Sequence, residues 1–113
     1  MSDRTDENYL KDILEASRRA VAFSADLDFN KFSKDIKTQD AVVRNIEIIG
    51  EAAKNISEDS RKRYADIPWK QITGMRDRLI HHYFGVNIDI VWSVVKEDLP
   101  QLIKILSEKE FSE

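Results

Sequence analysis

Hydrophobic residues recur at spacings of three and four along most of this chain, which is the pattern of α-helices with one buried side. The first stripe predicts a helix over residues 5–27 that Thr5 can cap. The second predicts a helix over residues 38–56 that begins at Thr38. Its apolar positions are Val42, Ile46, Ile49, Ala53 and Ile56. Such a stripe is typical of a helix packed lengthwise on a partner, and Gly50 beside it allows another backbone to approach closely.

Two further periodic segments follow a short helix predicted over residues 57–65. The third long helix is predicted over residues 69–83, with Gly85 ending it in a left-handed conformation. The last is predicted over residues 88–106, and Pro100 inside it should kink or break the helix because proline lacks an N–H group. Residues 28–37 show no long period and are interpreted as a connection that Phe29 and Phe32 anchor to the core. Trp69 and Trp92 are interpreted as further anchors of the core and the connections.

Long helices with short connections predict an all-α fold, an antiparallel four-helix bundle with one short extra helix. The composition supports this prediction, because 3 glycines and 2 prolines leave few tight turns for a sheet. A chain of 113 residues can bury one modest core, so we expect a single domain over residues 1–113.

The net charge and the absence of cysteine exclude several classes of function. Without cysteine, a disulfide framework or a thiolate metal site is excluded. We find no apolar run of about 18 residues and no secretory segment, and therefore expect a cytoplasmic protein without a membrane span. The formal net charge of −3 argues against broad coating of nucleic acid, but it leaves room for a local phosphate site.

The candidate chemistry lies in the third predicted helix. On an ideal helix its apolar side gathers Ile72, Met75, Leu79, Ile80 and Tyr83. Arg76 falls near the middle of that side, where its charge needs an anionic partner. That partner is either internal, with Glu47 of the second helix as the candidate, or an external anion such as a phosphate.

His81 is the second candidate, and it lies about 140° around the same ideal helix from Arg76. One straight helix therefore does not aim both side chains at one point. A shared site needs long reach, a bent helix or a second subunit. Asp77 precedes His81 by four residues and can orient its imidazole.

An arginine and a histidine that converge on a phosphodiester suffice for RNA cleavage without a metal. The imidazole can move the proton of a 2′-OH or of the leaving 5′-oxygen, and the guanidinium stabilises the charge that develops on the phosphorus oxygens. The plainer alternative is that His81 and His82 are helix-end residues favoured by the helix dipole. A metal site is disfavoured because neighbouring helical histidines diverge and no HExxH pattern is present, so we expect neither metal nor cofactor.

A charged line on the second helix, Arg44, Glu47 and Glu51, allows two interpretations. Such a line is usually a solvated face with local ion pairs. It can also line a polar cleft, and periodicity does not distinguish the two.

The stretch from Arg76 to Tyr83 resembles the R-x4-H-x-Y motif of the HepT-like branch of the HEPN superfamily. The resemblance extends to residues 44–53, 68–70, 89–92 and 98–100, and it covers roughly residues 10–106. It implies a helical homodimer in which the motifs of two subunits meet in a cleft. It also implies a metal-independent endoribonuclease that acts as the toxin of a toxin–antitoxin pair.

Carried over residue by residue, the resemblance makes Arg76 and His81 catalytic and brings Arg44 and Glu47 near the cleft. Tyr83 matches the tyrosine to which an MntA-like nucleotidyltransferase antitoxin transfers AMP. The alternative from a different class is a non-catalytic helical dimer that binds a nucleotidyltransferase, its nucleotide, or both.

Overall fold

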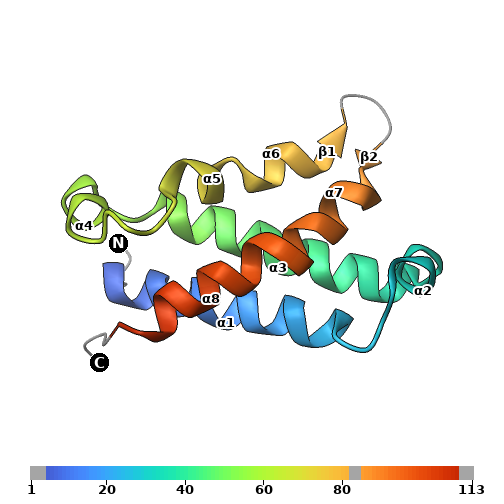
Figure 1. Ribbon diagram of the computed structural model, residues 1–113. Coiled ribbons are helices and arrows are strands. Elements are labelled where there is room, and N and C mark those ends of the chain that lie inside the picture. The colour runs from blue at the N-terminus through green and yellow to red at the C-terminus, as the bar shows by residue number, and fades with distance from the viewer. Residues whose placement is uncertain (1–4, 82–84, 110–113) are drawn as a thin grey trace.

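The computed structural model describes residues 5–81 and 85–109, with residues 80 and 81 described by their backbone only. These residues form four helical arms that run antiparallel in sequence order (Figure 1), which confirms the all-α prediction. The arms are α1 (Asp6–Ser24), α3 (Ile36–Lys54), α5 (Trp69–Thr73) with α6 (Met75–Leu79), and α7 (Ile88–Ser93) with the π-helical turn η1 (Val94–Asp98) and α8 (Leu99–Ser107). In the described part of the chain, two short helices, α2 (Phe29–Lys34) and α4 (Glu58–Arg63), lie between the arms where the sequence predicts one.

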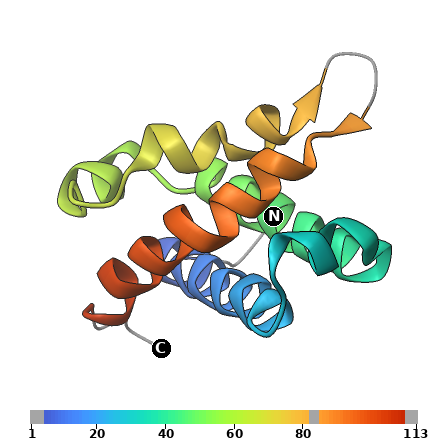
Figure 2. The same ribbon diagram turned by 45° about the vertical axis from the view of Figure 1, so that its right-hand side comes forward.

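The α1 and α3 helices lie side by side as a central pair, with α5–α6 packed on α3 and α8 packed on α1 (Figure 2). All four arms contribute fully buried apolar side chains. These include Leu10, Ile13, Val42, Ile46, Ile49, Ile72, Met75, Leu79, Val91, Leu99 and Leu106. The periodic stripes of the sequence therefore mark the sides that meet in the core.

Side chains from the flanking loops cap the predicted helix starts. The hydroxyl groups of Thr5 and Ser57 each accept a hydrogen bond from the backbone N–H three residues further on, which confirms the cap at Thr5 and shows that Ser57 caps α4. The second long helix begins earlier than predicted, because its cap is Asp35. This carboxylate accepts hydrogen bonds from both the backbone N–H and the hydroxyl of Thr38, at 3.0 and 2.7 Å.

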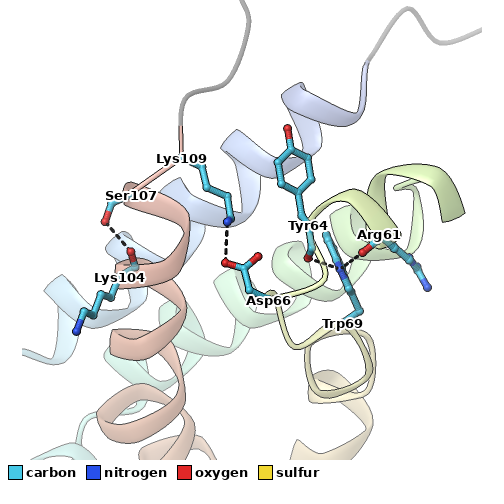
Figure 3. Close-up of polar contacts among 7 residues, drawn as sticks. All are labelled: Arg61, Tyr64, Asp66, Trp69, Lys104, Ser107 and Lys109. Carbon is cyan, nitrogen blue, oxygen red and sulfur yellow. Dashed lines mark hydrogen bonds and ion pairs between the residues drawn. The ribbon is translucent and has the colours of Figure 1, made fainter.

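The four anchoring aromatic residues hold the connections. Trp92 packs on buried Phe32 with 5.0 Å between ring centroids, and on the partly exposed Phe29 at 5.9 Å. At the other end of the molecule, Trp69 Nε1 donates to the backbone carbonyls of Arg61 and Tyr64, each at 3.1 Å (Figure 3). The start of α5 is thereby tied to the end of α4.

The third arm differs from the prediction of one helix over residues 69–83. It is divided at Gly74, its helical part ends at Leu79, and the chain continues as strand β1 (Ile80–His81). This strand pairs antiparallel with β2 (Gly85–Val86). The backbone N–H of Asn87 donates to the carbonyl of Leu79 at 2.6 Å, where a continuing helix would take the N–H four residues further on. Gly85 has the predicted positive φ, +80°, but it belongs to a hairpin and does not cap a helix.

The last arm shows the predicted effect of Pro100. The turn directly before it is π-helical, with the Leu99 N–H bonded to the carbonyl of Val94, five residues back. Proline at this place removes a helical hydrogen bond and crowds the carbonyl of Lys96, so the widened turn accommodates it. Among residues 5–81 and 85–109, no helix has the length and apolar character needed to cross a membrane.

Candidate active site

Helix α6 lies against α3 at Gly50. A Cβ atom on this buried glycine would stand 3.8 Å from the carbonyl oxygen of Ile72 and 4.0 Å from the Cβ of Arg76. These are ordinary contact distances, so the two backbones are close and one methyl group fills the space between them. The close approach predicted for Gly50 is confirmed, and it places the Cβ atom of Arg76 on the surface of α3.

Arg76 reaches the carboxylate that the sequence suggested. Its Nε donates to Oε2 of Glu47 on α3 at 3.4 Å, and its Nη1 lies 4.0 Å from Oδ1 of Asp77. The side chain is 49% exposed, although the helical pattern placed it on the buried side. The reason is that the long stem can cross the small Gly50 and bring the charged group to water. The remaining N–H groups of the guanidinium are thus accessible to a second anion.

His81 lies in β1, two residues beyond the end of α6, and its backbone pairs with Gly85. The angle of about 140° between Arg76 and His81 assumes one continuous helix. That assumption is wrong, because the helix ends at Leu79. His82 and Tyr83 lie outside the described residues.

The charged residues on α3 face two different helices, α6 and α1. Glu47 contacts α6 through Arg76, whereas Arg44 is exposed and faces a shallow pocket between α1 and α3. That pocket is lined by Tyr9, Asp12, Arg44, Ile48, Glu51, Ala52 and Asn55. Glu47 therefore contacts Arg76, whereas Arg44 lines the pocket beside α1.

Asp77 projects from α6 with 78% of its side chain exposed, and its Oδ1 lies 4.0 Å from Arg76 Nη1. In the part of the chain that the structure describes, no three His, Asp or Glu side chains gather as they would around a metal ion. The described site is thus a half-exposed arginine between two carboxylates, in the first turn of the short helix that leads to His81.

A second ion pair on α6 was not predicted from the sequence. Arg78 Nη1 lies 3.3 Å from Oδ2 of Asp98, the last residue of the π-helical turn. Arg78 follows Arg76 by two residues and therefore leaves the helix on nearly the opposite side. No sequence signal connects Arg78 with Asp98, because their contact depends on how the fourth arm crosses α6.

The chain is similar to proteins named as ribonucleases. The family model described as Ribonuclease HepT-like matches residues 13–108. A protein of Methanocaldococcus jannaschii named "Putative RNase MJ0127" is 47% identical over 100 residues, which cover 88% of this chain and 83% of that protein. A protein of Thermococcus cleftensis named "Probable ribonuclease HepT" is 48% identical over 99 residues, which cover 88% of this chain and 90% of that protein. No solved structure matches the chain.

The match to the family model includes the residues of the candidate site. It begins inside α1, ends one residue past α8 and includes the whole of α6 with Arg76 and the β1 strand with His81. The resemblance seen in the sequence is confirmed, and this chain belongs to the ribonuclease HepT-like family of enzymes.

Proposed function

We propose that the protein is a metal-independent endoribonuclease in which Arg76 binds the scissile phosphate and His81 transfers protons. The observation that carries this proposal is the half-exposed guanidinium of Arg76, held loosely by Glu47 in a chain of the ribonuclease HepT-like family. An exposed pair at 3.4 Å contributes little energy, whereas a phosphate can accept two short charge-assisted hydrogen bonds from one guanidinium. RNA can therefore displace Glu47 or share Arg76 with it.

The reaction needs a base, an acid and a stabilised phosphorane-like charge. The 2′-oxygen of the ribose bonds to phosphorus while the bond from phosphorus to the 5′-oxygen breaks, which leaves a 2′,3′-cyclic phosphate. The imidazole of His81 either takes the 2′-OH proton, with water then protonating the 5′-oxygen, or gives a proton to the 5′-oxygen, with water then taking the 2′-OH proton. Arg76 stabilises the negative oxygens on phosphorus. The reaction thus uses side chains of the protein and water.

We further propose that the working site is shared by two subunits of a homodimer. Within one protomer, Arg76 lies in α6, which ends at Leu79, whereas His81 lies in β1, so the two candidate residues are carried by different elements. A second copy that brings its own His81 to Arg76 would complete the site, as the family resemblance implies. Arg44, exposed beside Glu47 on α3, is then available to the RNA or to the second subunit.

Regulation by an MntA-like nucleotidyltransferase is the third part of the proposal, and it would make the protein the toxin of a cytoplasmic toxin–antitoxin pair. The phenol oxygen of Tyr83 would attack the α-phosphorus of ATP, pyrophosphate would leave, and AMP would remain on the tyrosine. Its phosphate, seven residues after Arg76 in the sequence, would compete for the guanidinium and repel RNA. The test is incubation with such an enzyme and ATP. Mass spectrometry should show added AMP in the wild type and none in Tyr83→Phe.

The direct test of catalysis is RNA cleavage by the purified, unmodified protein in excess EDTA. The wild type should cleave, and Arg76→Ala and His81→Ala should lose cleavage. Arg19→Ala is the matched control, because Arg19 forms an exposed ion pair with Glu15 on α1, away from α6. Cleavage that persists in both site variants would contradict the proposal. A wild type that binds the nucleotidyltransferase and never cleaves RNA would favour the non-catalytic dimer.

A further inference from the structure

The two arginines of α6 connect this short helix to two different arms. Arg76 reaches Glu47 on α3, and Arg78 reaches Asp98 at the end of η1. Residues two positions apart on a helix point about 200° apart, so the two contacts hold opposite sides of the same turn. A helix of five residues has little stability of its own, and its rotation must be set by its neighbours.

The side chain of Asp98 does not cap the helix that follows it. It occupies the N-cap position of α8, where an aspartate ordinarily accepts a hydrogen bond from a backbone N–H of the first turn. Its backbone is helical, with φ −76° and ψ −47°, and its side chain makes no capping bond. The carboxylate instead lies 3.3 Å from Arg78 Nη1, and only 19% of the Asp98 side chain is exposed, compared with 44% for Arg78.

The π-helical turn explains why Asp98 faces α6. The Leu99 N–H bonds to the carbonyl five residues back, so η1 contains one residue more per turn than an α-helix does. This extra residue changes the direction in which every following side chain leaves the helix. Pro100 maintains the wide turn, because a regular helix there would bring its ring against the carbonyl of Lys96. Single π turns of this kind occur frequently at functional sites.

The same arm contacts the end of α6 a second time. Asn87, directly before α7, donates its backbone N–H to the carbonyl of Leu79 at 2.6 Å. One contact therefore sets where α6 ends and β1 begins, and the other sets how α6 is rotated. Rotation matters because turning α6 away from η1 would also move Arg76 relative to Glu47.

We propose that Asp98 is a positioning residue of the active site: through Arg78 it sets the rotation of α6 and so the aim of Arg76. This inference rests on the proposed ribonuclease function and adds to it a residue that does not touch RNA. Arg78 is placed as the transmitting side chain, since its guanidinium is engaged by Asp98 on the side opposite Arg76.

The test compares cleavage kinetics of Asp98→Asn with those of the wild type in EDTA. The neutral amide keeps the size of the side chain but loses the charge. We expect kcat to fall roughly tenfold, because a small misplacement of a catalytic group is costly, while KM changes little. Thermal unfolding should stay close to that of the wild type, because Arg78 is 44% exposed and a solvent-accessible ion pair contributes little stability. Glu15→Gln, which breaks the exposed pair with Arg19, is the matched control and should leave kcat unchanged.

Restoration of the pair gives the sharper readout. Arg78→Asp and Asp98→Arg should each lower kcat, and the double variant with both changes should recover part of the loss. This comparison also applies if Asp98→Asn fails to fold, because the double variant restores the pair. A double variant no faster than either single variant would overturn the inference.

The other outcomes separate this inference from the proposed function. If Arg76→Ala abolishes cleavage while Asp98→Asn keeps the wild-type kcat, the inference is wrong and the function stands. The inference is equally wrong if Arg78→Ala raises KM and Asp98→Asn changes nothing, because Arg78 then contacts RNA directly. If Arg76→Ala cleaves like the wild type, the proposed function itself fails.

Discussion

The guanidinium of Arg76 makes a long, half-exposed contact with Glu47, at 3.4 Å between Nε and Oε2. Such a contact orients the planar group without occupying all of its donors, since a guanidinium carries five N–H groups in a fixed fork. The side of the fork away from Glu47 can then meet a phosphate. Residue identity matters here more than charge, because lysine offers one compact ammonium group that cannot reproduce the fork.

We therefore expect Arg76→Lys to lose most of its activity although the charge is kept. Cleavage of a defined RNA in EDTA should fall by roughly a hundredfold, which is the usual loss when one donor to a developing oxyanion is removed. Arg19→Lys, in the exposed pair on α1, should cleave at the wild-type rate. An Arg76→Lys variant with wild-type kcat would mean that a positive charge alone suffices and that the fork geometry is unimportant.

Gly50 provides a second test at the residue scale, because the side chain of Arg76 begins directly beside it. Gly50→Ala should leave stability unchanged or slightly improved, since its Cβ would meet Ile72 and Arg76 at ordinary contact distances and alanine favours helices. Gly50→Leu should lower the free energy of unfolding by about 1–3 kcal/mol, because the larger side chain must push α5–α6 from α3. Urea unfolding measures both. A leucine variant as stable as the alanine variant would contradict the close packing.

At the scale of elements, the first helix is joined to α4 by one carboxylate. Asp6 Oδ2 accepts hydrogen bonds from the hydroxyls of Ser57 and Ser60 at 2.6 and 2.5 Å, and Oδ1 accepts one from the Ser57 backbone N–H at 3.2 Å. Partial burial raises the pKa of Asp6, but these three hydrogen bonds outweigh it, and the net pKa lies below the ordinary value of 3.8. The ionised form of Asp6 is therefore favoured in the folded protein.

This shift predicts how the Asp6 contact depends on pH. A carboxyl group whose pKa is lowered on folding stabilises the folded state above its unfolded pKa, and the contribution is lost as pH falls through the folded pKa. Asp6→Asn should thus be less stable than the wild type at pH 7, and the difference should shrink in acid below the ordinary value of 3.8. Urea unfolding at the two pH values measures it. A deficit of equal size at both would show that the charge of Asp6 is not involved.

The elements also show how far the sequence could predict the structure. The long arms, the cap at Thr5, the helix start at Ser57 and the contact between Arg76 and Glu47 follow from local signals, namely helical stripes and a charge on an apolar side. The end of α6 could not be predicted, because nothing near Leu79 in the sequence stops a helix. A hydrogen bond from Asn87, on the next arm, ends it.

Contacts between distant segments set the remaining features. The pair of Arg78 and Asp98 joins two arms whose crossing is fixed by packing, and the sequence gives no periodic signal for it. The short helix α2 was predicted as a connection because six residues are too few to show a helical stripe. Its buried Phe32 nevertheless marked correctly where the connection meets the core.

At the scale of the whole molecule, an acidic chain that acts on RNA must place its positively charged side chains at the site that binds RNA. The net charge is −3, so long-range attraction to RNA is weak and binding depends on local groups such as Arg76. Two copies of the chain would bring two such arginines together, which one protomer cannot do. The proposed dimer would therefore bring the His81 of the second subunit and a second Arg76 to the site.

The central claim is that Arg76 of one subunit works with His81 of another, and mixing two inactive variants tests it. Arg76→Ala and His81→Ala should each be inactive alone. Mixed dimers then contain one site with both residues intact, so random exchange of subunits should restore about a quarter of wild-type cleavage in EDTA. If both residues acted within one subunit, every site in the mixture would lack one of them. A mixture as inactive as its separate components, although native mass spectrometry shows mixed dimers, would contradict the shared site.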